Sequence, residues 1–172
     1  MSRSLRQFLK TPAGRFLARY AVILAVAFAF IALKPVNDHV VNPYTTFVAH
    51  EGALALRLLG EEATVNNRIL SSRRFAVAIY NGCNGLEAIL IFACGILAFP
   101  APWRSKFLGL ALGFLGIQLF NVVRIVALYY TGVFKPAWFS TAHVLVWQSL
   151  VILFAVSMWI LWVQRYATQK SQ

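Results

Sequence analysis

Charged side chains are scarce in this chain. They make up 12% of its 172 residues, while 60% of the residues are hydrophobic. An average soluble domain is about 25% charged and roughly 45–50% apolar. The composition therefore excludes an ordinary soluble globular domain and predicts a membrane protein.

Acidic residues are scarcer still, because 5 Asp and Glu stand against 16 Lys and Arg, a formal net charge of +11. The basic residues are concentrated in the N-terminal segment, in a turn near residues 104–106 and in the C-terminal tail. By the positive-inside rule these places are cytoplasmic, so we expect a multi-pass protein of the cell (inner) membrane with both termini inside and the candidate site residues at the extracytoplasmic face. The rule explains most of the positive charge, so membrane lipid is an expected partner and nucleic acid is not.

Cysteine is nearly absent, with 2 residues, Cys83 and Cys94. Helical geometry would separate them by roughly 16 Å, so they cannot form a disulfide. No Cys/His cluster has the spacing of metal ligands, and His39 and His50 lie in a polar loop without a visible partner. We expect no metal site and no cofactor.

A cleavage site is also lacking. The first apolar stretch runs directly into KPVNDH, without the small residues that follow the core of a signal peptide. An uncleaved anchor is therefore favoured. Cleavage, the alternative, would leave the downstream topology unchanged.

Four apolar stretches remain, at residues 16–33, 83–99, 107–130 and 142–163. A membrane-spanning helix needs about 20 mostly apolar residues. The fold predicted is an all-α polytopic membrane helix bundle with about four transmembrane helices and no second domain. Its expected parts are an N-terminal anchor helix (1–33), an extracytoplasmic loop (34–82), a three-helix core (83–163) and a cytoplasmic tail (164–172).

The outer loop has a pattern of its own. Residues 43–60 have the apolar spacing of an amphipathic helix that lies on the membrane or on the other helices, and Gly60 would end it. Residues 69–80 alternate between apolar and small side chains, which indicates an extended or hairpin segment.

Arg124 is an ionisable residue inside an apolar span. Such a residue is expensive in lipid and is by default a functional hypothesis. It lies roughly 9 Å below the outer end of its helix, on one polar stripe with Gln118 and Asn121. The alternative is that Arg124 pairs with Glu87 to fix helix packing.

Cys83 stands between two Asn-Gly pairs at the expected outer start of a helix. A helix N-terminus and a nearby arginine would both favour its reactive thiolate form. The alternative is a small buried hydrophobic residue.

His143 is expected in the first turn of the last span, behind Ser140 and Thr141, either of which can cap the helix. There the helix dipole keeps the imidazole neutral and suited to act as a general base. An interfacial histidine without a task is the alternative. Threading the spans through a bilayer brings Cys83, Arg124 and His143 to one face, a combination that fits acyl transfer through a cysteine nucleophile.

Three motifs carry a family resemblance: NGCNGLEAILIF from residue 81, NVVRI around Arg124 and TAHVLVWQ around His143. In this order they resemble the exosortase and archaeosortase family of membrane transpeptidases, most closely exosortase H, which is paired with IPTL-type C-terminal sorting signals. The resemblance implies that Cys83 is the nucleophile, His143 the general acid/base and Arg124 the electrostatic stabiliser of a catalytic core.

The same resemblance implies a substrate class, exported proteins that end in a short motif, an apolar span and a basic tail. Glu87, Asn121 and Asn84 are our own candidates for supporting residues. A rival from another class stays open: a non-catalytic membrane assembly or small-solute transport protein, in which the intramembrane polar residues line a path or hold helices together.

Overall fold

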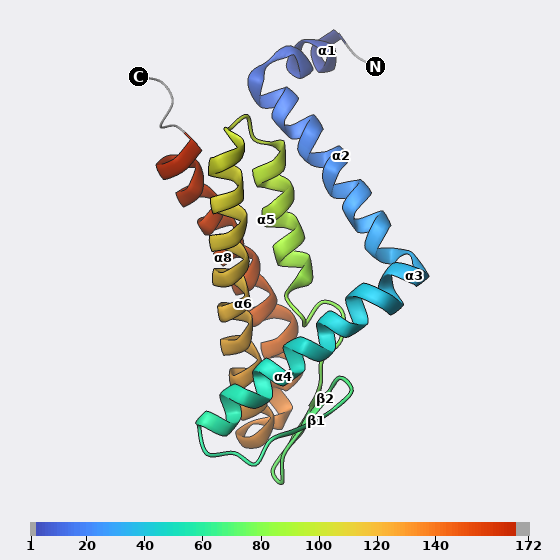
Figure 1. Ribbon diagram of the computed structural model, residues 1–172, viewed down its shortest axis with the longest axis vertical. Coiled ribbons are helices and arrows are strands. Elements are labelled where there is room, and N and C mark those ends of the chain that lie inside the picture. The colour runs from blue at the N-terminus through green and yellow to red at the C-terminus, as the bar shows by residue number, and fades with distance from the viewer. Residues whose placement is uncertain (1–2, 168–172) are drawn as a thin grey trace.

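The computed structural model describes residues 3–167. Figure 1 shows them as a bundle of long helices, with one helix lying obliquely across the bundle and a small sheet at the same end. The chain starts with α1 (Arg3–Lys10) and α2 (Pro12–Ala32). A short bend, α3 (Lys34–Val36) and the π-helical η1 (Asn37–Val41), leads into α4 (Asn42–Leu58). The prediction of an all-α membrane bundle is confirmed.

The sheet follows α4 and contains β1 (Thr64–Asn66), β2 (Ile69–Ser71) and β3 (Ala76–Ala78). The strands are antiparallel in the order β1-β2-β3, and Leu70 is the partner of Val77 in the register. The predicted hairpin therefore exists, with β1 as an additional strand. The helix expected at residues 43–60 is α4.

Two helices complete the bundle core after the sheet, α5 (Leu86–Ala98) and α6 (Trp103–Phe134). The last helical stretch changes its winding along its length. It begins with the 3-10 turn η2 (Pro136–Trp138), α7 (Phe139–Thr141) and the π-helical η3 (Ala142–Trp147). It ends with α8 (Gln148–Trp162) and the π-helical η4 (Val163–Ala167).

Three helices in the described part of the chain are long and apolar enough to cross a membrane: Pro12–Ala32, Trp103–Phe134 and Pro136–Tyr166. The second of the four expected spans is shorter than predicted. Helix α5 has 13 residues, which is about 20 Å of helix against a hydrocarbon core of about 30 Å. Its expected start at Cys83 is replaced by a turn.

One end of the bundle carries basic residues without acidic ones, and it is called the basic end below. Helix α1, the α5–α6 turn and the end of α8 all lie there, while α4 and the sheet lie at the other end (Figure 1). At the basic end, the Lys106 ammonium donates to the Leu97 carbonyl at 2.8 Å, and the Trp162 indole donates to the Ser105 carbonyl at 2.9 Å. Residues 168–172 of the expected cytoplasmic tail lie outside the described residues.

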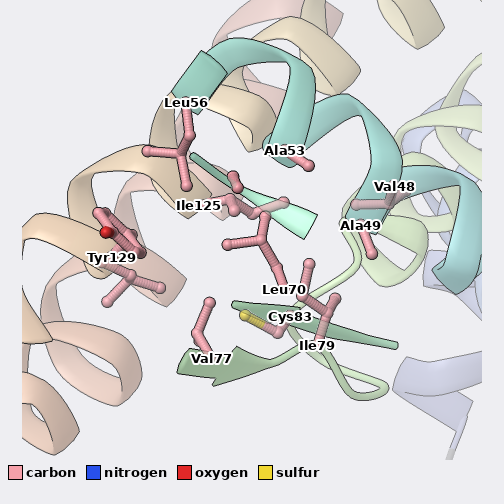
Figure 2. Close-up of a cluster of buried hydrophobic side chains, with 12 residues drawn as sticks. Val48, Ala49, Ala53, Leu56, Leu70, Val77, Ile79, Cys83, Ile125 and Tyr129 are labelled. Atoms are coloured by element: carbon pink, nitrogen blue, oxygen red, sulfur yellow. The ribbon is translucent and has the colours of Figure 1, made fainter. Parts of the chain in front are cut away.

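The end of the bundle that carries α4 and the sheet, called the outer end from here on, has its own hydrophobic core. The buried face of α4 packs with the sheet and with the outer part of α6, and Cys83 lies in this cluster with Leu70, Val77 and Ile79 (Figure 2). A second cluster joins α5, α6 and α8 nearer the basic end. The outer core places the Cys83 turn against α6.

Candidate active site

Cys83 lies in a tight turn that precedes α5. Its backbone N–H donates to the Tyr80 carbonyl at 2.9 Å. Gly82 and Gly85 have φ angles of +86° and +77°, in the left-handed region that glycine adopts at little cost. The prediction that Cys83 begins the helix is wrong, since the two positive-φ residues hold it in a turn three residues before Leu86.

Asn84 fixes this turn from inside the protein. Its side chain is 1% exposed, and its amide nitrogen donates to the Thr45 hydroxyl of α4 at 2.8 Å. Its amide oxygen accepts from the Leu86 N–H at 3.1 Å, which occupies one of the unpaired donors at the start of α5. Asn84 therefore joins the Cys83 turn to both α4 and α5.

Arg124 projects from α6 into the interior and is 1% exposed. Its Nη2 donates to the Oε1 of Gln148 at 3.1 Å. Within residues 3–167, its Nε has no hydrogen-bond partner. Its charge interacts with Cys83 and Glu87, but the two ion pairs of the described residues, Arg73–Glu62 and Arg74–Glu61, do not include it. The alternative interpretation, an Arg124–Glu87 ion pair that fixes helix packing, is therefore not found among the described residues.

His143 lies in the π-helical segment η3 rather than in the first turn of a helix. The helical stretch begins at Pro136, and neither Ser140 nor Thr141 caps η3 through its side chain. The imidazole stacks on the Phe139 ring with centroids 6.2 Å apart. Its Nε2 is buried and has no hydrogen-bond partner in the described part of the chain.

Of the three predicted site residues, Arg124 is the one that interacts with both others. The Arg124 guanidinium interacts through its charge with both Cys83 and His143. Ala142, the residue before His143, packs on the same hydrophobic cluster that contains Cys83. A thiol, a guanidinium and an imidazole from a turn, α6 and η3 thus share one region at the outer end of the bundle.

The environment of Cys83 does not favour the free thiolate. The residue is 5% exposed, and this burial raises the pKa of the thiol above its usual range, while the charge of Arg124 lowers it in opposition. The expectation of a thiol activated by a helix end and an arginine is therefore only half met. A buried protonated thiol needs a base to remove its proton before it can attack a carbonyl.

Glu87 borders a pocket beside the same turn. The pocket has a volume of about 200 Å³ and lies between the outer end of α2, η1 and the start of α5, with Gly82 and Asn84 in its wall. Asn121 lies on α6, one turn before Arg124, and is fully buried. No group of three or more His, Cys, Asp or Glu residues that could hold a metal ion occurs among the described residues.

Sequence reasoning missed Gln148. A glutamine in an apolar span can be recognised from sequence, but its hydrogen-bond partner, Arg124, cannot. A π-helix closes its hydrogen bonds between residues five apart, so η3 brings residues 143 and 148 roughly onto one side of the helix. In the α-helix assumed from sequence, residues 143 and 148 would point to different sides.

The fold and this polar region define the chain as a helical membrane protein with a buried cysteine, a buried arginine and a half-buried histidine at one end of the bundle. The sequence model of the transmembrane exosortase family (Exosortase_EpsH) matches residues 12–163. The chain belongs to this family, which is consistent with a transpeptidase role at family level. No curated protein and no solved structure matches it significantly.

Proposed function

We propose that the protein is a membrane-embedded cysteine transpeptidase that cleaves the C-terminal sorting signal of exported proteins and transfers them to an acceptor. The observation that supports the proposal is the charge interaction of Arg124 with both Cys83 and His143. In addition, the buried Nε of Arg124 and Nε2 of His143 have no hydrogen-bond partner among the described residues. Unpaired polar atoms at a buried site are groups that a substrate can satisfy.

In this mechanism His143 accepts the proton of the Cys83 thiol, and the thiolate attacks the scissile carbonyl of the signal. Arg124, oriented by Gln148, stabilises the oxyanion that forms. One such donor is worth about 2.7–4 kcal/mol of barrier. His143 then gives its proton to the leaving amine, and the thioester passes to an acceptor amine or to water.

The finer assignments belong to the same proposal. The sequence of the motif around Cys83, NGCNGLEAILIF, supports an exosortase H type that handles IPTL-type signals. The excess of basic over acidic residues at the basic end supports an inner-membrane protein with cytoplasmic termini and an extracytoplasmic site. Its substrates would be exported proteins that end in a short motif, an apolar span and a basic tail, so enzyme and substrate meet within one membrane.

Substitution of the nucleophile tests the proposal directly. In host cells that lack the chromosomal gene, Cys83→Ser and Cys83→Ala supplied in trans should abolish removal of such tails, as measured by immunoblot. Cys94→Ala, in the middle of α5, is the matched control and should process normally. Wild-type protein should also yield a hydroxylamine-sensitive adduct at Cys83 by mass spectrometry. Processing by folded, inserted Cys83→Ala would contradict the proposal and favour the transport or assembly alternative.

A further inference from the structure

Asn121 is the most completely buried polar group near the site, with an exposed fraction of 0%. Both of its side-chain polar atoms, Nδ2 and Oδ1, have no hydrogen-bond partner among residues 3–167. Burying a donor and an acceptor without partners costs free energy that an apolar side chain would not cost. These two atoms are therefore available to a partner outside the folded chain.

The position of Asn121 points to that role. A Cβ added at Gly85 would lie 2.9 Å from the Asn121 Cγ, so the side-chain amide lies directly against the turn that holds Cys83. Asn121 is also one helical turn from Arg124 on α6. It therefore contacts the turn that holds Cys83 and lies on the same helix as the guanidinium.

Gln118, one turn earlier on the same helix, shows the contrast. Its Oε1 accepts from the Tyr44 hydroxyl at 2.7 Å, and its Nε2 donates to the Glu51 carboxylate. The buried side-chain atoms without partners among the described residues belong instead to Asn121, Arg124 and His143, and otherwise to Trp159 near the other end of the bundle. The unsatisfied hydrogen bonding is thus concentrated where the proposed chemistry takes place.

We propose that Asn121 binds the backbone of one extended residue of the sorting signal next to the scissile bond, with Nδ2 donating to that residue's carbonyl oxygen and Oδ1 accepting from its N–H. This inference rests on the proposed function. A carboxylate ligand would leave Oδ1 unsatisfied, and an ammonium group would leave Nδ2 unsatisfied. One extended residue satisfies both atoms, because its own N–H donor and C=O acceptor point to the same side of the strand. The Nε of Arg124 is then left for the oxyanion.

The test uses two substitutions at this position in the full-length protein. Asn121→Leu keeps the branching at Cγ and removes both polar atoms. If Asn121→Leu fails to fold, Asn121→Ala serves as the test of substrate binding by Asn121. Tail removal per folded molecule should fall about 10-fold to 100-fold in both, the effect of losing two substrate hydrogen bonds. The melting temperature of Asn121→Leu in nanodiscs should equal or exceed that of wild type.

Gln118→Leu is the matched control on the same helix. It leaves Tyr44 and Glu51 without their partner, so its melting temperature should fall while tail removal per folded molecule stays within about twofold of wild type. A second measurement separates substrate binding from reshaping of the turn. The rate at which iodoacetamide alkylates Cys83, followed by mass spectrometry, should stay within about twofold of wild type in both Asn121 variants.

Near-normal processing by either Asn121 variant overturns the inference. So does a fall in Cys83 alkylation that parallels the fall in processing, because Asn121 would then act by holding the turn. Cys83→Ser separates the two proposals in the same assay. If that variant still processes tails, the proposed function itself fails; if it is inactive while Asn121→Leu is active, the role of Asn121 alone is refuted.

Discussion

At the scale of single residues, the site combines a thiol that burial keeps protonated with one buried cation. Burial raises the pKa of Cys83 and the charge of Arg124 lowers it, so the cation reduces the cost of forming the thiolate without removing it. Arg124 also offers a planar fork, of which one end donates to Gln148 and Nε is free of protein partners in the described chain. Charge and shape are therefore separable contributions of one side chain.

Two substitutions of Arg124 should separate these contributions. Arg124→Gln removes the charge that lowers the Cys83 pKa, so the rise of Cys83 alkylation with pH should shift to higher pH. Arg124→Lys keeps the charge and should leave that profile close to wild type. It loses the planar fork, so tail removal should still fall about 10²–10³-fold. Alkylation by iodoacetamide from pH 6 to 10 and processing in cells are the two measurements.

The lysine variant is the decisive one. Near-normal processing by Arg124→Lys would mean that a point charge is sufficient and would remove the oxyanion role. An unchanged alkylation profile in Arg124→Gln would mean that the guanidinium does not act on the thiol.

At the residue level, the sequence singles out side chains that are anomalous in their own segment. Arg124 stands out because a cation in an apolar span is costly, and Cys83 stands out between two Asn-Gly pairs. The contacts of Asn84 with Thr45 and of Gln148 with Arg124 were not predictable, because each joins elements distant in sequence. Burial of the Cys83 thiol was missed for the same reason, since α4 and the sheet supply its cover.

At the scale of elements, hydropathy located the helices well and their ends less well. The predicted stretches overlap α2, α5, α6 and the last helix, but α5 begins three residues after the predicted position. That difference follows from the positive φ of Gly85, which a helix cannot contain. The π-helical winding of η3 has no pattern in the sequence, so its effect on which residues share a side could not be foreseen.

A second prediction concerns Gly85, in the turn before α5, and Gly60, which follows α4. Both have a positive φ angle, but only Gly85 is closely surrounded by other atoms. Gly85→Ala would place a Cβ in the left-handed region and 2.9 Å from Asn121, whereas Gly60→Ala, at φ +90°, meets nothing within 4 Å. Gly60→Ala should cost about 1–2 kcal/mol from backbone strain alone. Gly85→Ala should cost more and should also slow tail removal, as measured by thermal unfolding and by processing in cells.

Equal destabilisation by the two substitutions would show that the Gly85–Asn121 contact is unimportant. The double variant Gly85→Ala with Asn121→Ala removes the clash. Its loss of stability should therefore be smaller than the sum of the two single losses.

At the scale of the whole molecule, the length of α6 relates the site to the membrane. Its 32 residues extend about 48 Å, well beyond a hydrocarbon core of about 30 Å. Arg124 lies about 32 Å along this axis from Trp103. The part of α6 beyond it packs against the outer hydrophobic core, and the Tyr129 hydroxyl there bonds to Ser72 and Glu61. The proposed site would therefore lie close to one membrane surface, opposite the basic end.

This arrangement predicts which loops face outward. Lys135 follows the outer end of α6, and Arg104 lies in its first turn at the basic end; both side chains are exposed. In a background of Cys83→Ala and Cys94→Ala, Lys135→Cys should react with a membrane-impermeant maleimide in intact spheroplasts. Arg104→Cys should react only after the membrane is permeabilised, because the positive-inside rule places that turn in the cytoplasm. Labelling of Arg104→Cys from outside would reverse the orientation and place the site on the cytoplasmic face, where exported substrates could not reach it.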